Sequence, residues 1–391
     1  MKNKKISIIG GSGHVGMPLG LKFAQKGYKV TAIDKNETLN KLLNDGEVPY
    51  KELEAGKLLK SALKKKKIFF TNSLSEIKNS EFIIITVGTP ITEKKKPNMN
   101  YVFKVIDEIK KYLNNNQSII LRSTIYPGTS LKFIKKLRKI NLKTKVSYCP
   151  ERVAQGKSIY EIENLTQIIS SEDEKEIYKI TKLFKSICKK IEILNFNEAE
   201  YSKLFSNAWR YIKFAVANEF FMLSQKRGLN FNKVYKAMTS HYPRNNDFPK
   251  QGFAGGPCLP KDTIQLWHSC KIHSKLAYNS YLVNQSMPKF IVNNLKGKIK
   301  FKKNKIGVLG TTFKSGIDDE RDSLSLNLIK YLRKMNAKVF FYDPYIKSKN
   351  QTKLNFILRN CKIIFIGTPH PEFKKINFKN IEVIDCWNFI N

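Results

Sequence analysis

One stretch of the chain places a cysteine where its thiol could act as a nucleophile. Residues 253–262 read FAGGPCLPKD, and Pro260 suits the first turn of a helix, so Cys258 stands just before that helix begins. The helix N-terminus and the neighbouring Lys261 both favour the thiolate, which is the reactive form. Asp262 lies one turn inside, near enough to hold a water or take a proton. The alternative is an inert cysteine in a glycine turn, and we favour the reactive one.

A second set of polar residues shares one helix face. Residues 198–227 contain no Pro or Gly and predict a long helix that ends at Gly228. Lys203, Asn207 and Arg210 follow one another on it at i, i+4 and i+7. A solvated polar stripe has the same spacing, so this pattern alone leaves a site and a surface equally open.

A glycine-rich loop near the start of the sequence predicts a dinucleotide site. Gly11, Gly13 and Gly16 form a GxGxxG that follows a strand-like run and opens a helix. The first glycine allows the tight turn, the second lets the backbone approach a pyrophosphate, and the third lets helix and strand pack closely. Asp34 ends the next strand, 18 residues beyond Gly16, where it would bind the ribose hydroxyls. Since an acid there repels a 2′-phosphate, we expect NAD rather than NADP.

Several other residues occupy positions near a bound cofactor. His14 and Val15 complete the loop, with His14 expected to pack beside it rather than to perform chemistry. Thr89, Thr124 and Glu151 each follow a predicted strand. In an open parallel sheet, the carboxyl ends of the strands are where ligands bind.

Short apolar runs alternate with amphipathic stretches through the first half of the chain, which predicts a parallel sheet covered by helices. Strands are expected near 5–9, 29–33, 67–70, 82–87, 118–122, 145–148, 167–170 and 191–194. Helices are expected near 14–26, 101–113, 129–139 and 172–188. A mostly helical middle section follows, with helices near 232–239, 262–275 and 279–296.

The last section repeats features of the first. The run KISIIG at 5–10 resembles KIGVLG at 305–310, and VGTP at 87–90 resembles IGTP at 366–369. We therefore expect an α/β fold with two Rossmann-like, doubly wound parallel-sheet domains joined by a central helical domain with one long helix. The expected boundaries are 1–196 for the NAD-binding domain, 197–299 for the central helical domain with the cysteine, and 300–391 for the last domain.

The chain has 391 residues and a formal net charge of +39. Its lysines are scattered among Asn and Ile, as a bias in codon usage would produce, so we favour that explanation over a nucleic-acid surface. The six cysteines include no CxxC pair and no zinc spacing, which indicates free thiols, a reducing compartment and no metal. The first apolar stretch breaks at Gly10, and no apolar run approaches the ~20 residues of a membrane span. A cytoplasmic protein is expected.

These motifs together resemble the UDP-glucose/GDP-mannose dehydrogenase family along nearly the whole chain. The matching segments are GSGHVG at 11–16, VGTP at 87–90, STIYPGT at 123–129, PERVAQGK at 150–157, GGPCLPKD at 255–262, FKSGIDDERDS at 313–323 and DPY at 343–345. So many motifs in this order are far more specific than GxGxxG alone.

The resemblance implies a four-electron oxidation of a sugar C6 alcohol to a carboxylate by two NAD. Cys258 would form a thiohemiacetal and then a thioester. Lys203 would stabilise the oxyanion with Asn207 beside it, and Asp262 would organise a water as general base. Glu151 would assist hydrolysis of the thioester, and Thr124 would position water or the nicotinamide.

The resemblance also implies binding residues. The substrate contacts would be Arg152, Val153, Lys203, Asn207, Arg210, Arg244, Phe253, Gly255, Phe313 and Lys314. Arg321 would touch the cofactor. Because Arg244 can reach into a neighbouring subunit in the family, a homodimer built on the long helix is expected, with a higher oligomer as the alternative.

The segment after Pro150 bears on the sugar. It reads ERVAQGK, with Gln155 where glucose and mannose enzymes carry a second acid, and it is similar to the branch that oxidises UDP-N-acetylhexosamines. Pro257 also matches that branch. UDP-N-acetylmannosamine is therefore the expected substrate, with UDP-glucose as the alternative. A two-electron β-hydroxyacid dehydrogenase, which has no use for Cys258, and a basic nucleic-acid-binding protein are ranked below.

Overall fold

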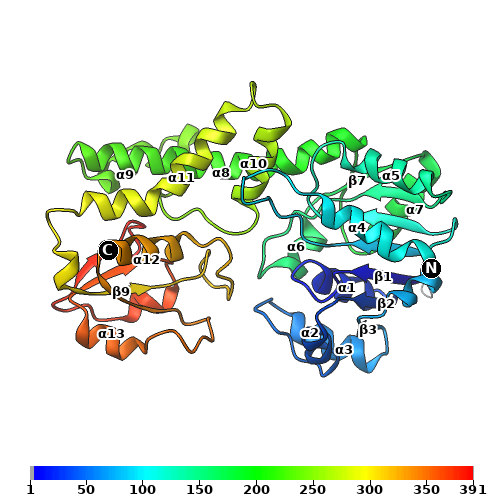
Figure 1. The fold of residues 1–391 in the computed structure, drawn as a ribbon, viewed down its shortest axis with the longest axis horizontal. Coiled ribbons are helices and arrows are strands. Elements are labelled where there is room, and N and C mark those ends of the chain that lie inside the picture. Colours follow the sequence, from blue (N-terminus) through cyan, green and yellow to red (C-terminus); the bar gives the residue numbers. More distant parts are fainter. Residues whose placement is uncertain (1–3, 391) are drawn as a thin grey trace. The chain divides into compact units, whose positions relative to one another are not determined.

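The protein is described by a computed structural model that covers residues 4–390. Contacts within the chain group it into two compact units, one ending at Phe205 and the other beginning at Ser206 (Figure 1). The three-domain boundaries expected from the sequence stay predictions. Over residues 4–390, the structure contains no helix with the length and apolar character required to cross a membrane.

The first unit is built on an eight-stranded sheet in the order β3-β2-β1-β4-β5-β6-β7-β8. Its strands are β1 (Lys5–Ile9), β2 (Lys29–Ile33), β3 (Ile68–Thr71), β4 (Phe82–Ile85), β5 (Ser118–Leu121), β6 (Lys145–Tyr148), β7 (Gln167–Ser171) and β8 (Ile191–Ile193). All eight lie where the sequence predicts them. The order reverses between β1 and β4, the point at which open parallel sheets bind ligands beyond the carboxyl ends of their strands.

Helices cover both faces of this sheet, as predicted. They are α1 (Gly16–Gln25), α2 (Glu37–Asn44), α3 (Ala55–Lys64), α4 (Asn100–Ile109), α5 (Thr129–Lys139), α6 (Ser158–Asn164) and α7 (Glu174–Phe184), with 3-10 turns η1 (Leu74–Asn79) and η2 (Lys110–Tyr112). Neighbouring residues of one strand point to opposite faces, so Ile8 joins one apolar core and Ile9 the other. Both cores are closed to water, which explains the nearly continuous apolar character of β4 and β5.

One pair of strands departs from the parallel arrangement. Strand β7 runs antiparallel to β6, with Tyr148 opposite Ser170. Since consecutive antiparallel strands are joined at the same end, the connection 149–166 stays at the carboxyl edge of β6. This connection carries Glu151 and Arg152, so the departure keeps them at the edge where ligands bind.

The second unit combines helices with a four-stranded sheet. Helix α8 (Phe196–Lys226) enters it from the first unit and is followed by α9 (Phe231–Thr239), η3 (Pro243–Asn245), α10 (Leu259–Ser269) and α11 (Lys275–Asn294). The sheet has the order β10-β9-β11-β12, with β9 (Lys305–Leu309), β10 (Lys338–Tyr342), β11 (Ile363–Ile366) and β12 (Glu382–Ile384). Helices α12 (Leu324–Lys334) and α13 (Leu354–Asn360) and turns η4 (Phe301–Lys303) and η5 (Pro371–Lys375) complete it. Met287 and Ile291 of α11 share one core with Ile306 and Val308 of β9.

The two sheets share the register that their sequences suggest. Lys5 pairs with Lys29 on β2, and Lys305 pairs with Lys338 on β10. A left-handed glycine directly follows β1 and β9, Gly10 at φ 81° and Gly310 at φ 87°. The amide of each donates to the last carbonyl of the neighbouring strand over 2.8 Å. The repeated sequence motif therefore corresponds to a repeated backbone turn.

The turn at Gly310 has no room for a side chain. A Cβ there would lie 2.4 Å from the carbonyl oxygen of Thr368, whereas Gly316, also left-handed at φ 76°, has open space around it. Gly316→Ala should therefore cost about 1–2 kcal/mol of unfolding free energy from the backbone alone. Gly310→Ala adds a collision and should cost about 1–3 kcal/mol more.

Urea unfolding followed by tryptophan fluorescence measures this difference, because Trp209, Trp267 and Trp387 all belong to the second unit. Equal losses in the two variants would contradict the packing explanation.

Candidate active site

The glycine-rich loop after β1 leaves one face open. A Cβ on Gly11 would lie 2.7 Å from Cα of Ala32, and one on Gly16 would lie 2.4 Å from the carbonyl oxygen of Gly10. At Gly13, by contrast, the added atom would meet only the Gly10 oxygen, at 3.4 Å. The first and third glycines thus serve packing, and the second leaves the backbone accessible to a ligand. Helix α1 begins at this loop and directs its positive end toward the space.

Asp34 directly follows β2 and lies beside this loop. Its carboxylate accepts the backbone N–H of Asn36 at 3.0 Å and that of Ser12 at 3.4 Å. Asn40 ties the loop down further, since the Ser12 hydroxyl donates to its Oδ1 at 2.6 Å. An accessible carboxylate next to a helix N-terminus fits the ribose and pyrophosphate of NAD, so the residues present suit the predicted cofactor.

The other predicted cofactor residues of the first unit, His14, Val15, Thr89 and Thr124, follow β1, β4 and β5. The ring of His14 packs on Tyr50 with 4.0 Å between centroids, in agreement with a packing position beside the loop. Val15 directly precedes the first residue of α1. The Thr89 hydroxyl donates to the Thr124 carbonyl at 2.5 Å, which joins the loops after β4 and β5.

Glu151 is part of a buried ion pair that the sequence analysis missed. Arg122, at the end of β5, is only 2% exposed, and its Nε donates to Glu151 Oε2 at 2.8 Å. The guanidinium also reaches the Cys149 carbonyl and Gln167 Oε1, at 3.1 and 2.9 Å. The other oxygen of Glu151 accepts two backbone N–H groups of the segment that follows. An arginine just beyond a buried apolar strand was the available signal, because a buried cation needs a partner.

That segment contains two of the predicted substrate residues. The N–H groups of Arg152 and Val153 donate to Glu151 Oε1 at 2.7 and 3.0 Å. The Arg152 guanidinium donates to the Thr166 carbonyl, and burial lowers the pKa of Arg152. The Val153 side chain packs against the core of the first unit.

Helix α8 places its polar residues in two environments. Lys203 and Asn207 are both buried, whereas Arg210 is exposed. The predicted face therefore holds two residues that are shielded from water and one that is accessible. Shielding strengthens electrostatic interactions, so the first two are suited to stabilising developing charge.

Cys258 occupies the predicted position at the start of α10, with its side chain exposed. The Asp262 N–H donates to the Cys258 carbonyl at 2.9 Å, which begins the helix. The Asp262 carboxylate is fully buried and accepts Asn207 Nδ2 at 2.6 Å on one oxygen, while the Lys261 ammonium pairs with the other. The structure thus brings Asn207, Cys258 and Asp262 together within the second unit.

Arg321 lies close enough to Cys258 to be influenced by it. The pKa of Arg321 is raised chiefly by its hydrogen bonds to Asp319, and the negative charge of a Cys258 thiolate adds to the effect. Its Nη2 lies 2.6 Å from Asp319 Oδ2. Arg321 was expected to touch the cofactor, and its ion pair with Asp319 was not predicted.

Close packing, rather than an open approach, explains the glycines before the cysteine. A Cβ on Gly255 would lie 2.7 Å from the Asp322 carbonyl oxygen, and one on Gly256 would lie 2.5 Å from the Phe313 ring. Phe253, a predicted substrate residue, is 4% exposed and packs edge-on against Trp387. Gly256, two residues before Cys258, therefore packs on the Phe313 ring, and Gly255 packs on the backbone of Asp322, while the Phe253 side chain faces the core.

The buried carboxylate of Asp343 holds the loop that carries Phe313 and Lys314 in place. Asp343 accepts the N–H groups of Thr311 and Thr312 at 2.7 and 3.1 Å, and His370 Nε2 lies 3.0 Å from the same oxygen. Burial disfavours the charge on Asp343, but the hydrogen bonds from His370 and the backbone outweigh it and lower its pKa. Lys314 is exposed.

Arg244 lies apart from these groups in the chain, on η3. It is exposed, and its Nε donates to the Tyr242 hydroxyl at 2.8 Å. An exposed guanidinium held by a neighbouring ring is accessible to a partner, as a role in another subunit would require.

The chain matches three domains of one known protein family. Residues 4–188, 197–286 and 307–391 match the NAD binding domain, the central domain and the UDP binding domain of the UDP-glucose/GDP-mannose dehydrogenase family. The chain is similar to a UDP-N-acetyl-D-mannosamine dehydrogenase of Pyrococcus horikoshii, with 31% identity over 388 residues, 96% of this chain and 92% of the relative. A UDP-glucose 6-dehydrogenase of Rickettsia felis is 29% identical over 412 residues, 97% of this chain and 92% of the relative.

Solved structures agree with these matches. The UDP-D-ManNAc dehydrogenase structure from Pyrococcus horikoshii has a TM-score of 0.91 and covers 99% of this chain and 96% of its own. A UDP-glucose dehydrogenase structure from Pyrobaculum islandicum also has a TM-score of 0.91, covering 99% and 94%, and at 22% identity it shows a shared fold. The chain therefore belongs to the UDP-glucose/GDP-mannose dehydrogenase family and is an NAD-dependent oxidoreductase.

Proposed function

We propose that this protein oxidises the C6 alcohol of a UDP-N-acetylhexosamine to the uronic acid through a covalent bond to Cys258. The specific substrate that we propose is UDP-N-acetylmannosamine. The observation that carries the proposal is the exposed cysteine at the start of α10, next to a buried carboxylate held by Asn207 and Lys261. A thiol beside a helix N-terminus is suited to nucleophilic attack, and a buried carboxylate is suited to accepting a proton.

Each residue of the site has a separate role in the proposed reaction. NAD, when bound, accepts a hydride in each of two oxidations. Cys258 Sγ adds to the aldehyde carbon left by the first, which forms a thiohemiacetal, and the second oxidation converts this adduct to a thioester. Lys203 and Asn207 stabilise the oxyanion that develops on the sugar during the reaction. Both are buried on one face of α8, where shielding from water strengthens their electrostatic interaction with it. Asp262 takes the proton from the water that finally breaks the carbon–sulfur bond.

Glu151 assists the hydrolysis by holding the segment that carries Arg152 and Val153. Its carboxylate is already surrounded by Arg122 Nε and Nη2 and by the backbone N–H groups of Arg152 and Val153. With its lone pairs engaged, it is less suited than Asp262 to accept a proton from water. Thr124 lies at the same edge of the sheet, where it would position water or the nicotinamide.

The choice of sugar rests on three kinds of support. The segment after Pro150 carries Arg152 and Gln155, and Pro257 precedes the cysteine. Relatives near 30% identity include several named UDP-N-acetyl-D-mannosamine dehydrogenases. The alternative is UDP-glucose, because relatives with that activity follow at 28–29% identity.

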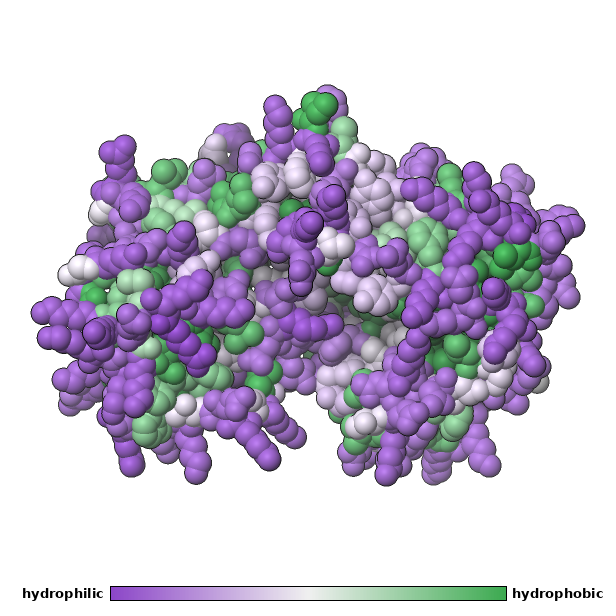
Figure 2. All heavy atoms as spheres, viewed as in Figure 1, coloured by the Kyte–Doolittle hydropathy of each residue, from purple (hydrophilic) through white to green (hydrophobic). Residues whose placement is uncertain are grey.

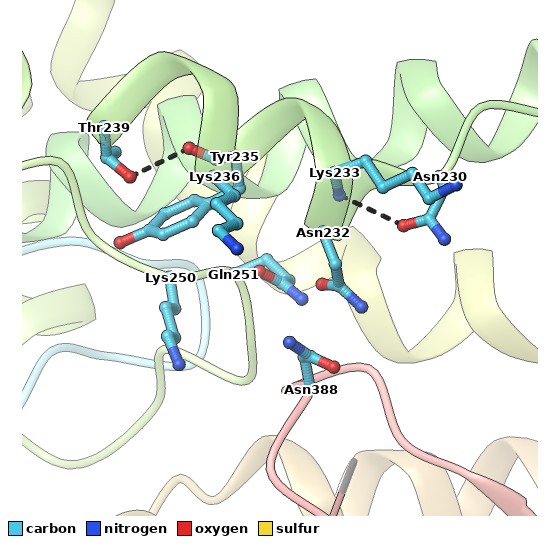
Figure 3. Close-up of a pocket in the computed structure, with 9 residues that line it drawn as sticks. All are labelled: Asn230, Asn232, Lys233, Tyr235, Lys236, Thr239, Lys250, Gln251 and Asn388. Atoms are coloured by element: carbon cyan, nitrogen blue, oxygen red, sulfur yellow. Dashed lines mark hydrogen bonds between the residues drawn. The ribbon is translucent and has the colours of Figure 1, made fainter. Parts of the chain in front are cut away.

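A pocket in the second unit is suited to the nucleotide. It measures about 380 Å³ and is lined by Asn230, Asn232, Lys233, Tyr235, Lys236, Thr239, Lys250, Gln251 and Asn388. Figure 3 shows Lys236, Gln251 and Asn388 around one space below α9. Three of the lining residues are lysines and none is acidic, and α9 begins here with its positive end. Lys250 and Gln251 lie on the loop that leads to Cys258, whereas the predicted substrate contacts Phe253, Gly255, Phe313 and Lys314 lie outside this lining.

We also propose a homodimer built on α8 and a cytoplasmic location. Phe205, Trp209, Val216, Phe220 and Leu223 are exposed and follow one another at helical spacing along one stripe of α8. An exposed apolar stripe of this kind is typical of a protein interface, although the surface in Figure 2 is mainly hydrophilic. All six cysteines are free, which supports a reducing compartment.

Incubation with a panel of UDP-sugars tests the reaction and the substrate together. UDP-N-acetylmannosamine should be turned over at least tenfold more efficiently than UDP-glucose, a difference of about 1.4 kcal/mol. Two NADH should form per sugar, because the thioester route requires two oxidations. Absorbance at 340 nm against product counted by chromatography gives the ratio. A ratio of one would exclude the thioester route in favour of a β-hydroxyacid dehydrogenase type of reaction, and turnover of UDP-glucose alone would reject the sugar.

Charge reversal in the pocket tests the nucleotide position. Lys236→Glu should weaken UDP binding by about tenfold or more, because one favourable charge is replaced by a repulsive one close to a phosphate. Lys275→Glu, at the exposed start of α11, is the matched control and should bind UDP as the wild type does. Isothermal titration with UDP provides both dissociation constants. Equal weakening in the two variants would indicate only the loss of overall positive charge.

A further inference from the structure

A short strap connects two parts of the first unit that lie far apart in the sequence. The strap consists of residues 48–54, between α2 and α3. Tyr50 contacts the glycine-rich loop, and Glu52 contacts the connection after β6. The strap thus touches the predicted cofactor site at one point and the segment with Glu151 and Arg152 at another.

The Tyr50 contact is both polar and aromatic. Its hydroxyl donates to the Gly13 carbonyl at 2.8 Å and lies 3.4 Å from the Ser12 carbonyl oxygen. Its ring lies against His14. Ser12, Gly13 and His14 belong to the loop whose backbone would face the cofactor. A shift of this loop on cofactor binding would therefore move Tyr50 as well.

The Glu52 contact is made by a carboxylate that is only 8% exposed. It accepts the N–H of Gly156 at 3.0 Å, the N–H of Ser158 at 2.6 Å and the Ser158 hydroxyl at 2.9 Å. The N–H of Leu53 adds a longer bond of 3.4 Å to the Gly156 carbonyl. The carboxylate therefore accepts a backbone N–H at the start of α6 that the helix itself leaves without a partner.

Segment 151–158 depends on such contacts because it is mostly irregular. Its N–H groups at 152 and 153 donate to Glu151, the one at 154 donates to Glu161 at 2.5 Å, and those at 156 and 158 donate to Glu52. Three carboxylates thus replace the bonds that a helix or strand would supply. Of these three carboxylates, Glu52 is the one that lies outside residues 151–161 in the sequence.

We propose that Glu52 is a positioning residue that holds segment 151–158 in place, and that the strap transmits cofactor binding at the glycine-rich loop to this segment. The inference deepens the proposed function and rests on it only for the roles of Glu151 and Arg152. Coupling arises because a cofactor that fixes the loop also fixes Tyr50, and through the strap it fixes Glu52. A more ordered strap lowers the cost of ordering the segment.

The burial of Glu52 agrees with a constrained position. Desolvation raises the pKa of Glu52, and the hydrogen bonds from Ser158 and Gly156 oppose this without cancelling it. Burying such a group is unfavourable unless its hydrogen bonds are made, so the strap and the segment are held together or loosened together.

Hydrogen exchange with ADP as the ligand tests the coupling. ADP carries the ribose and diphosphate that the loop and Asp34 would bind, but it lacks the nicotinamide, so it would not reach the segment directly. In the wild type, saturating ADP should slow exchange of the amides in 151–158 by about tenfold. Protection of residues 11–16 in the same spectra shows that the ligand is bound.

Two variants distinguish transmission of ADP binding through the strap from a simple loosening of segment 151–158. Glu52→Gln should speed basal exchange in 151–158 and remove the effect of ADP there. Tyr50→Phe keeps the contacts of Glu52, so basal exchange should stay as in the wild type while the ADP effect falls at least threefold. Persistence of the full effect in Tyr50→Phe, with the loop protected, would overturn the proposal, as would its absence in the wild type.

Glu200 offers a matched control in the same unit. It is fully buried and accepts the N–H groups of Gly128 and Ser130 and the Ser130 hydroxyl, at 2.5, 2.8 and 2.7 Å, at the start of α5. Glu200→Gln should loosen residues 128–130 but leave the ADP effect on 151–158 unchanged. Loss of the effect in this variant too would mean that general destabilisation explains the result. No sugar nucleotide is present, so an error in the proposed substrate would leave this outcome unaffected.

Discussion

The buried carboxylate of Asp262 is the interaction on which the site depends. A carboxylate without exposure to water must be paired and hydrogen-bonded, and here Asn207 supplies an amide and Lys261 an ammonium. The bond to Asn207 joins α8 to α10 one turn after Cys258. This bond therefore fixes α10, whose N-cap is Cys258, against the long helix.

The same physical device recurs where the chain lacks regular structure. Glu52 and Glu200 each accept two N–H groups and a serine hydroxyl at the start of a helix. Asp343 accepts two N–H groups below the loop that carries Phe313. In each case a fixed negative charge satisfies backbone donors that secondary structure leaves free. These carboxylates thereby hold irregular segments in place.

Local patterns allowed much of the fold to be predicted. Each strand of the first sheet, the glycine-rich loop and the helix start at Cys258 follow from apolar runs, glycines and a proline within a few residues of one another. Partners distant in sequence were beyond reach, as in the pairing of Arg122 with Glu151, because they depend on which strands become neighbours. Lys261 was expected to act on the thiol, and it also pairs with Asp262. The aromatic Phe253 shows the same limit, since only the packed structure directs its ring to Trp387.

Trapping the intermediate on the cysteine tests the central claim most directly. Acid quenching during turnover, with NAD and whichever UDP-sugar is oxidised, should leave a sugar-nucleotide adduct on the tryptic peptide 251–261. The adduct should be retained in Cys270→Ser, whose cysteine is also exposed, and be absent in Cys258→Ser. Peptide mass spectrometry reads both results. Formation of the uronic acid at the wild-type rate by Cys258→Ser, with no adduct in either protein, would contradict covalent catalysis at Cys258.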